Sequence, residues 1–459
     1  QELAIAASVG VAMIIVTNLV PLPVIMSYIG ISQPGIDHAY RASQSKAPVW
    51  RGLSAFASRK VAPFPIAIAI AMGIGGYYYS QDLKIGDLDK GAPELRADSR
   101  YNKDNAFMVG NYSTSSDVFV VMVETAPERC NAYKVMDAMD RFMWYMENVP
   151  GVQSATSLVT VSKLVTKSMN EGNLNWSALS RNQTVLNTSI QRAPGALLNS
   201  DCSMAPVIIY LNDHKAETLE TVVAAVENFK DSYDDDVDMK FYGYRYNELG
   251  QAIEEGEIDS VPVRFQLASG NAGIEAATNQ VIADAQGTML IFVYVVVFVL
   301  CFITFRSLRA VACILIPLAL TSILSQALMT YLDIGVKVAT LPVIALGVGI
   351  GVDYGIYIYN RLEVMILAGK SMQEAFFETL RSTGKAVSFT GVTLAIGVAT
   401  WMLSPIKFQA DMGILLTFMF LWNMLGALIL LPALASFLLK PESMLARHKK
   451  KHGDVPPAG

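Results

Sequence analysis

A single carboxylate lies within a long apolar stretch of this sequence. In GVGIGVDYGIYIYNR, residues 347–361, Asp353 is the only acid and the first basic residue is Arg361. An ionisable side chain in the middle of a membrane costs about 2.5–3.5 kcal/mol to insert and is by default a candidate for function. A carboxyl group in such surroundings could take up and release a proton. The alternative interpretation is a protonated or hydrogen-bonded acid with a structural role.

Hydroxyl groups accompany this acid. Tyr354 adjoins it, Tyr357 follows one turn later, and the next apolar stretch contains further Ser and Thr residues. Hydroxyls can hydrogen-bond to either form of a carboxyl group. Because Ser and Thr are also common in membrane helices, a packing role stays open for them. The candidate proton relay therefore comprises Asp353, Tyr354, Tyr357, Ser388, Thr390 and Thr393.

Glycines recur beside the acid at a helical spacing. Gly347, Gly351 and Gly355 are four residues apart, which predicts a smooth ridge for close helix packing. Asp353 follows Gly351 by two residues, a rotation of about 200° around a helix. We therefore expect the carboxylate to point away from the ridge.

The composition indicates a membrane protein. Of the 459 residues, 53% are hydrophobic and only 16% are charged, too few charges for an ordinary soluble enzyme. No GxxxxGK[ST] or GxSxG motif is present, and no His lies in an apolar run, so we expect neither enzymatic chemistry nor a metal or cofactor. Seven apolar runs are long enough to span a membrane: about 3–28, 61–80, 288–305, 310–331, 339–359, 386–404 and 412–438.

Charge gives an orientation. Lys and Arg are concentrated in 31–60, 306–309, 360–385 and 440–459, which the positive-inside rule places in the cytoplasm. Residues 81–286 carry 30 acidic and 17 basic residues, a net charge of −13, and the remainder carries +8, which together give the −5 of the whole chain. This acidic segment is expected on the opposite side, and no nucleic-acid partner is indicated.

The segment outside the membrane has a mixed α/β pattern. Its order of elements is βαβ–βαβ, that of the ferredoxin-like split motif. The expected strands are 117–124, 152–158, 205–211 and 237–243, and the expected helices are 131–148 and 216–231. A largely helical insert, 159–204, separates the two halves, and 274–286 is expected to lead as a helix into the third span.

The four cysteines differ in their surroundings. Cys301 and Cys313 lie in apolar runs, where a thiol commonly serves as a small apolar filler. Cys130 follows the first expected strand and Cys202 precedes the third. These strands are antiparallel neighbours in the expected sheet, so a Cys130–Cys202 disulfide is predicted for an oxidising compartment.

An internal repeat links the first and last spans. LPVIMSY (22–28) matches LPALASF (431–437), and an acid stands 20 residues before each Leu, at Glu2 and Asp411. Internal repeats of this kind are typical of transporters. We expect the first span to end a preceding half of a longer protein. The resulting division is 1–30 as the span that ends the first repeat, 31–60 as a cytoplasmic amphipathic linker, 61–80 as a span, 81–286 as a periplasmic porter domain, 287–438 as a five-span bundle and 439–459 as a cytoplasmic tail.

Several of these stretches resemble one family. GVGIGVDYGIY, VSFTGVTLAIGVATW, SPIKFQADMGILL and RFQLASGNAGIEAATNQVI resemble the RND superfamily, and more closely its MMPL-like branch of hydrophobe and amphiphile exporters in proteobacteria. The resemblance implies a twelve-span α-helical membrane bundle in two halves, each with a ferredoxin-like periplasmic porter domain, in the bacterial inner membrane. Multidrug members carry a Lys in the corresponding span, where this sequence has Asp353 and Tyr354.

The activity implied is export of lipid-like molecules by a proton antiporter. The implied partners are the substrate, protons, the first half of the protein, further copies in a dimer or trimer, and a periplasmic carrier. Two alternatives remain, an accessory of protein translocation like SecD/SecF and a sterol-sensing membrane receptor. The insert, the GVGIGVDYG element and the repeated span favour the exporter.

Overall fold

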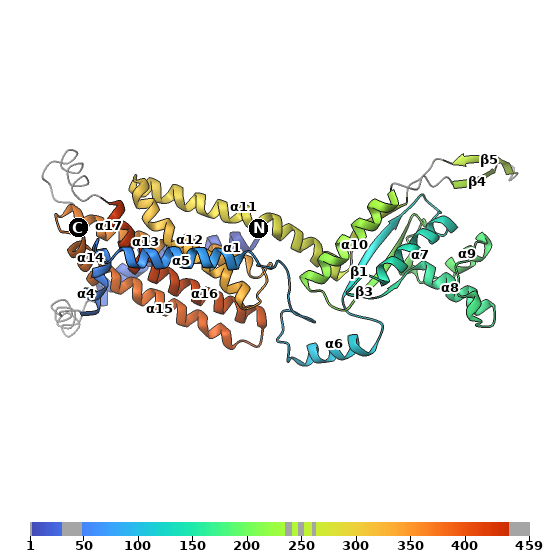
Figure 1. Ribbon diagram of the computed structural model, residues 1–459, viewed down its shortest axis with the longest axis horizontal. Coiled ribbons are helices and arrows are strands. Elements are labelled where there is room, and N and C mark those ends of the chain that lie inside the picture. Colours follow the sequence, from blue (N-terminus) through green and yellow to red (C-terminus); the bar gives the residue numbers. More distant parts are fainter. Residues whose placement is uncertain (1, 30–47, 235–240, 247–251, 259–262, 440–459) are drawn as a thin grey trace.

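The computed structural model is elongated, with a helical bundle at one end and an α/β part at the other (Figure 1). It describes residues 2–29, 48–234, 241–246, 252–258 and 263–439. Of the predicted tail 439–459, residues 440–459 lie outside the described residues, as do residues 31–47 of the predicted linker 31–60.

Among the described residues, six helical segments are long and apolar enough to cross a membrane, which confirms a membrane helical bundle. These are Ser8–Ile29, Asn271–Phe305, Leu308–Tyr331, Leu341–Leu367, Met372–Leu403 and Lys407–Leu438. The remaining predicted span, 61–80, corresponds to helix α5, Pro63–Ser80, which packs along α12, Leu308–Tyr331. Its glycines and three consecutive tyrosines make it less apolar, so its role as a span stays a prediction.

The bundle is built from a small set of helices joined by short turns. Its long helices are α11 (Asn271–Phe305), α12, α13 (Leu341–Leu367), α15 (Lys385–Ala399) and α16 (Lys407–Leu425). The other helical elements are α1 (Glu2–Leu19), α2 (Pro21–Ile29), α4 (Pro48–Ser54), α14 (Met372–Thr379), α17 (Leu431–Leu438), η1 (Ala55–Ala57) and η5 (Thr400–Leu403). Single π-helical turns lie at Leu380–Gly384 and Gly426–Leu430. The two repeated stretches fall on α2 and α17, each a short helix that ends a candidate span.

The glycine ridge of α13 lies directly against two neighbouring helices. A Cβ on Gly347 would stand 2.3 Å from Cε of Met419, and one on Gly351 would stand 2.3 Å from Nδ2 of Asn423. Asn423 also donates a hydrogen bond of 2.8 Å to the carbonyl of Gly347. At Gly355 a Cβ would lie 2.9 Å from Ile314 on α12. Side chains at these three positions would force the helices apart, so the ridge fixes which face of α13 enters the core.

The α/β part of the molecule is called the outer part. It contains a four-stranded antiparallel sheet in the order β2–β3–β1–β6 (Figure 1). Its strands are β1 (Val118–Glu124), β2 (Val152–Thr156), β3 (Met204–Leu211) and β6 (Arg264–Ser269). Helix α7 (Tyr133–Glu147) joins β1 to β2, and α10 (Ala216–Asp234) follows β3. This is the connection order of the split βαβ motif. Alternate residues of β1, from Phe119 to Val123, are buried under these helices, as period-2 patterning requires.

The predicted place of the fourth strand was wrong. Of the expected strand 237–243, residues 237–240 lie outside the described residues. Residues 241–243 belong to β4 (Phe241–Tyr246), which pairs with β5 (Ala252–Ile258) in a separate hairpin and not with the four-stranded sheet. The place beside β1 is taken by β6, whose Phe265 is 2% exposed and packs with its ring centroid 4.9 Å from that of Phe142. The apolar side chain of Phe265 gives β6 the buried face that a sheet position requires.

The predicted insert contains two helices, α8 (Leu158–Met169) and α9 (Gln183–Ile190), and the 3-10 turns η2 (Leu174–Trp176) and η3 (Gly195–Leu197). A further helix, α6 (Arg100–Asn111), was not expected from the sequence. In contrast, the predicted helical approach to the third span is confirmed, because α11 runs without interruption from Asn271 to Phe305.

Two sulfur atoms are joined in the outer part. Cys130 and Cys202 form a disulfide with a Cα–Cα distance of 5.0 Å, whereas Cys301 and Cys313 are free and buried.

We expect thiol titration of the denatured, unreduced chain to find two free thiols. The sequence separation of 72 predicts that reduction lowers the free energy of unfolding of the outer part by about 4 kcal/mol. Four reactive thiols would contradict the pairing.

The ridge can be tested with a matched pair of glycines on one helix. Gly351→Val places atoms where Asn423 and Leu318 stand, so we expect a loss of about 1–3 kcal/mol in the free energy of unfolding. Gly349→Val meets no atom within 4 Å and serves as the control, with a change within about 0.5 kcal/mol. Thermal unfolding in detergent measures both, and equal effects would show that the ridge does not carry the packing.

Candidate functional site

Asp353 lies on the face of α13 opposite the glycine ridge. Its side chain is exposed, and Tyr357, one turn further along, is 57% exposed. Among the described residues, no side chain hydrogen-bonds to the carboxylate of Asp353. The rest of the described chain therefore leaves this carboxylate uncovered.

The structure separates the other candidate relay residues. Tyr354 points inward, with 3% of its surface exposed and its hydroxyl buried without a hydrogen-bond partner in the described part of the chain. On α15, Thr390 and Thr393 are exposed and Ser388 is half-buried. Asp353, Tyr357, Thr390 and Thr393 thus remain accessible, whereas Tyr354 belongs to the core.

An uncovered acid in a membrane helix has a clear physical consequence. Ionisable side chains within the bilayer almost always face a bundle interior or a water-filled cavity, because an ion in hydrocarbon is unfavourable. This face of α13 can therefore hold a proton when it is dry and release it when water or a polar partner reaches it.

A second group of charged residues lies where the bundle meets the outer part. A strap at 81–99 follows α5 and runs between them. Lys337 pairs with Asp87 at 2.6 Å, and Lys407 pairs with Asp89. Arg96 donates to the carbonyls of Met402 and Ser404. The strap also forms isolated β-bridges, Ile85 with Val336 and Leu95 with Ile406. The strap therefore ties the two loops at this end of the bundle to one segment.

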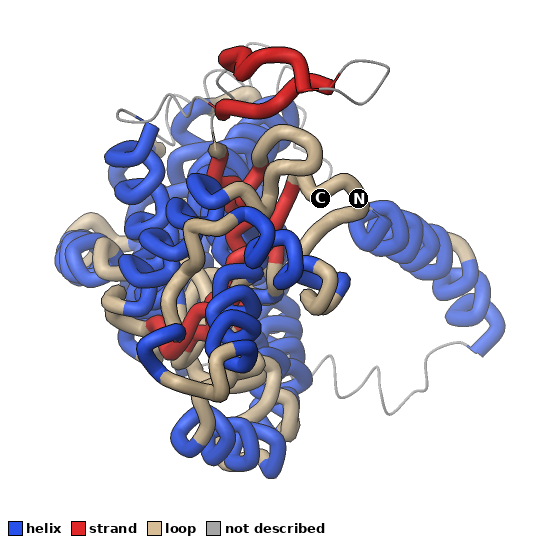
Figure 2. Tube along the Cα trace, turned by 90° about the vertical axis from the view of Figure 1, so that its right-hand side faces the viewer, coloured by secondary structure: helices blue, strands red, loops and turns tan. Residues whose placement is uncertain are grey.

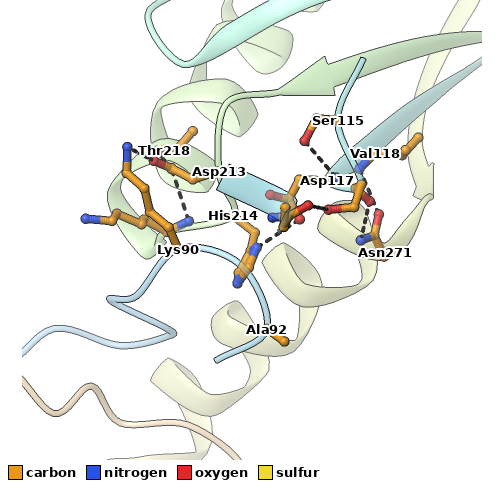
Figure 3. Close-up of polar contacts among 12 residues, drawn as sticks. Lys90, Ala92, Ser115, Asp117, Val118, Asp213, His214, Thr218 and Asn271 are labelled. Carbon is orange, nitrogen blue, oxygen red and sulfur yellow. Dashed lines mark hydrogen bonds and ion pairs between the residues drawn. The ribbon is translucent and has the colours of Figure 1, made fainter. Parts of the chain in front are cut away.

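The sheet joins this junction through polar contacts, of which the one between His214 and Asp117 is buried (Figure 3). Nδ1 of His214 lies 3.0 Å from Oδ1 of Asp117, and the two side chains are each 6% exposed. The side chain of Asn271, at the start of α11, accepts from the amide of Val118 and donates to the carbonyl of Ser116. The first turn of α11 is thereby held against the start of β1.

His214 is positively charged at neutral pH. Burial disfavours the imidazolium, but the hydrogen bond with Asp117 and the nearby carboxylates of Glu275 and Asp87 favour it more strongly. Together they raise the pKa of His214 to about 9. A buried charged pair then contributes to the attachment of β1 to the loop that carries His214.

Sequence reasoning missed the junction. The sequence patterns assigned no role to Lys337, Lys407 or His214, and Asp117 entered only as the first residue of the expected strand 117–124. A signal was present in GDLDKG, residues 86–91, where two acids stand near the membrane end of the outer segment and match the two loop lysines in number. The pairing itself depends on contacts between residues far apart in sequence.

The imidazolium predicts a pH dependence. The pKa of about 9 in the folded protein exceeds the value of 6.5 for a free imidazole. The stabilisation is therefore complete below about pH 6.5 and is lost as the pH rises through 9. We expect the free energy of unfolding of the outer part to fall by about 2–3 kcal/mol over this range. His214→Gln should remove most of this fall in thermal unfolding, and an unchanged slope would show that the ring is not charged.

The comparisons with known proteins agree with the bundle. Residues 244–454 match the MMPL family. The membrane protein MJ1562 of Methanocaldococcus jannaschii is 24% identical over 189 residues, 41% of this chain and 48% of that protein. The membrane protein SCO6666 of Streptomyces coelicolor is 34% identical over 89 residues, 19% of this chain and 13% of that protein.

A third relative has a described activity. MmpL3 of Mycobacterium leprae, named as a probable trehalose monomycolate exporter, is 32% identical over 100 residues, 22% of this chain and 10% of that protein. The chain matches less than half the length of each of these three relatives. Together with the apolar helices and the family match, they confirm the resemblance found in the sequence. The chain is a multi-pass membrane protein whose residues 244–454 are similar to the MMPL family of the RND superfamily.

Proposed function

We propose that this protein is a secondary transporter that uses the proton gradient to export hydrophobic or amphiphilic, lipid-like molecules from the inner membrane or periplasm. The observation that carries the proposal is the carboxylate of Asp353 on an uncovered face of α13, opposite the glycine ridge that packs against α12 and α16. The similarity to the MMPL family supports a transporter. The trehalose monomycolate export for which MmpL3 is named supports a lipid-like substrate.

The face that carries Asp353 needs a cover. An acid that faced lipid directly would be unfavourable, so another helical region must pack there or enclose water. We assign this role to a preceding half of the same protein, as the internal repeat indicates. Figure 2 shows the N-terminal helix apart from the rest of the bundle, and none of its apolar window is buried. In this proposal that helix belongs to the other half.

Protonation of Asp353 changes how α13 packs. A neutral Asp353 suits a dry contact between the halves, whereas an ionised one requires water or hydroxyl groups such as those of Tyr357 and Thr393. At the ridge, no glycine side chain interlocks with the neighbouring helices, and Asn423 donates a hydrogen bond to the carbonyl of Gly347. A shift of α13 between two packings therefore disrupts few specific contacts.

The movement reaches the outer part through α11 and the strap. Helix α11 is continuous from the sheet into the bundle, and the loop before α13 is paired with the strap through Lys337 and Asp87. In this proposal residues 81–286 form a periplasmic porter domain, and the loops rich in Lys and Arg face the cytoplasm. A disulfide suits the periplasm. Assembly as a dimer or trimer and transfer of the lipid to a periplasmic carrier belong to the same proposal.

The test replaces the carboxyl group of Asp353 by an amide of the same shape that does not titrate. Asp353→Asn in the complete protein should leave folding and insertion intact and reduce proton-coupled export in proteoliposomes to background, because the amide cannot exchange a proton. Transport is measured as substrate efflux under an imposed pH gradient.

The matched control is Asp333→Asn, an exposed acid in the loop at the outer end of the bundle. Its backbone has a positive φ of 51°, a conformation that Asn also tolerates. This variant should export normally. Normal export by Asp353→Asn at equal expression would show that the membrane acid is structural only.

A further inference from the structure

A cavity of about 590 Å³ lies at the junction of the sheet and the bundle. Its walls come from the strap, from the start of β1, from the loop that carries His214, from α11, from the loop before α13 and from α16. It is separate from the uncovered face of α13, and no step of the proposed proton cycle uses it.

Two buried polar atoms in this cavity lack a partner within the described residues. His214 is 5% exposed, and its Nδ1 is occupied by Asp117, while its Nε2 has no hydrogen-bond partner. Oε1 of Glu275, one turn into α11, is likewise buried without a partner. The two groups are close enough to interact electrostatically. A charged imidazolium offers a donor at Nε2, and a carboxylate oxygen is an acceptor.

The charges that line the cavity do not balance. Four carboxylates and two cations face it, so the excess is two negative charges. Asp117 is paired with His214, and Asp87 is paired with Lys337. The carboxylates left over are Glu275 and Glu94. Burial and the like charges of Asp87, Asp117 and Glu94 disfavour the charged form of Glu275, whereas the imidazolium of His214 favours it. A bound cation would relieve this repulsion.

Elements of the bundle bring apolar side chains to the cavity, beside the charged Lys337. Ile282 on α11, Val338 in the loop before α13 and Phe408 on α16 line it. The cavity therefore offers polar groups toward the sheet and hydrocarbon toward the membrane, which is the arrangement that an amphiphile requires.

We propose that this cavity binds the head group of a cationic amphiphile that carries an ammonium beside a hydroxyl, an amino alcohol. The ammonium pairs with Glu275, the hydroxyl accepts from Nε2 of His214, and the alkyl chain leaves past Ile282 and Phe408. An alcohol alone leaves the excess negative charge uncompensated, and an amine alone leaves the imidazole donor unpaired. The identification of this ligand as the exported substrate rests on the proposed function, but its binding does not.

The probe is tritiated N-dodecylethanolamine, and binding to the purified complete protein is measured in dodecyl maltoside by scintillation proximity. Glu275→Gln should weaken binding about tenfold, equivalent to about 1.4 kcal/mol. The control is Glu217→Gln, which removes an exposed acid that is paired with Lys84 outside the cavity and should bind as the wild type does. Partition of the probe into micelles is common to all variants and cancels in the comparison.

Competition by related amphiphiles identifies the head group. Dodecylamine should compete several-fold more weakly than N-dodecylethanolamine, and dodecanol and dodecyl sulfate should compete least. Equal affinity of the wild type and a folded Glu275→Gln, with folding checked by its elution profile and melting temperature, would overturn the proposal. Equal competition by dodecanol would do the same.

The outcome is independent of the test of transport. Asp353→Asn should bind the probe with unchanged affinity even though it does not export. Loss of export without loss of binding supports both proposals, whereas normal export by Asp353→Asn together with loss of binding in Glu275→Gln rejects the proton role alone.

Discussion

The position of one carboxylate is dictated by the backbone contact on the other side of its helix. Gly347, Gly351 and Gly355 lie so close to α12 and α16 that α13 cannot be turned to place a larger side chain there. The helical repeat then fixes Asp353 on the opposite face. Because an ion that faces hydrocarbon is unfavourable, this geometry obliges something outside the described bundle to cover the acid. In the proposed transporter, a preceding half of the same protein supplies this cover.

A signal that begins at α13 has a short physical route to the sheet. Helix α13 contacts α11 and α12, and α11 continues unbroken to Asn271, which holds the start of β1. A second route runs through the loop before α13, where Lys337 joins the strap at Asp87. Both routes end beside the same cavity. A change of packing among the membrane helices would therefore also move the walls of this cavity.

Local patterns explain what the sequence could predict. The glycine spacing, the apolar runs, the first three strands and the helical approach to the third span each depend on residues close together along the chain. The fourth strand could not be chosen locally, because 237–243 and Arg264–Ser269 both have strand-like composition and only packing against Phe142 selects the second. The pairing of His214 with Asp117 and that of Lys337 with Asp87 join residues 97 and 250 positions apart. Such pairs leave no periodic signal, so the junction appears only in three dimensions.

The two ionisable sites differ in what surrounds them, and this difference assigns their roles. His214 has a counter-ion, Asp117, within its own chain, and its pKa of about 9 keeps it mostly charged near neutral pH. A group that does not change its charge cannot follow a proton gradient, so this pair serves to hold the junction together. Asp353 has no hydrogen-bond partner among the described residues, so its charge depends on whatever approaches its face. A carboxylate whose environment changes when two halves move is the kind of group through which proton binding and movement can be linked.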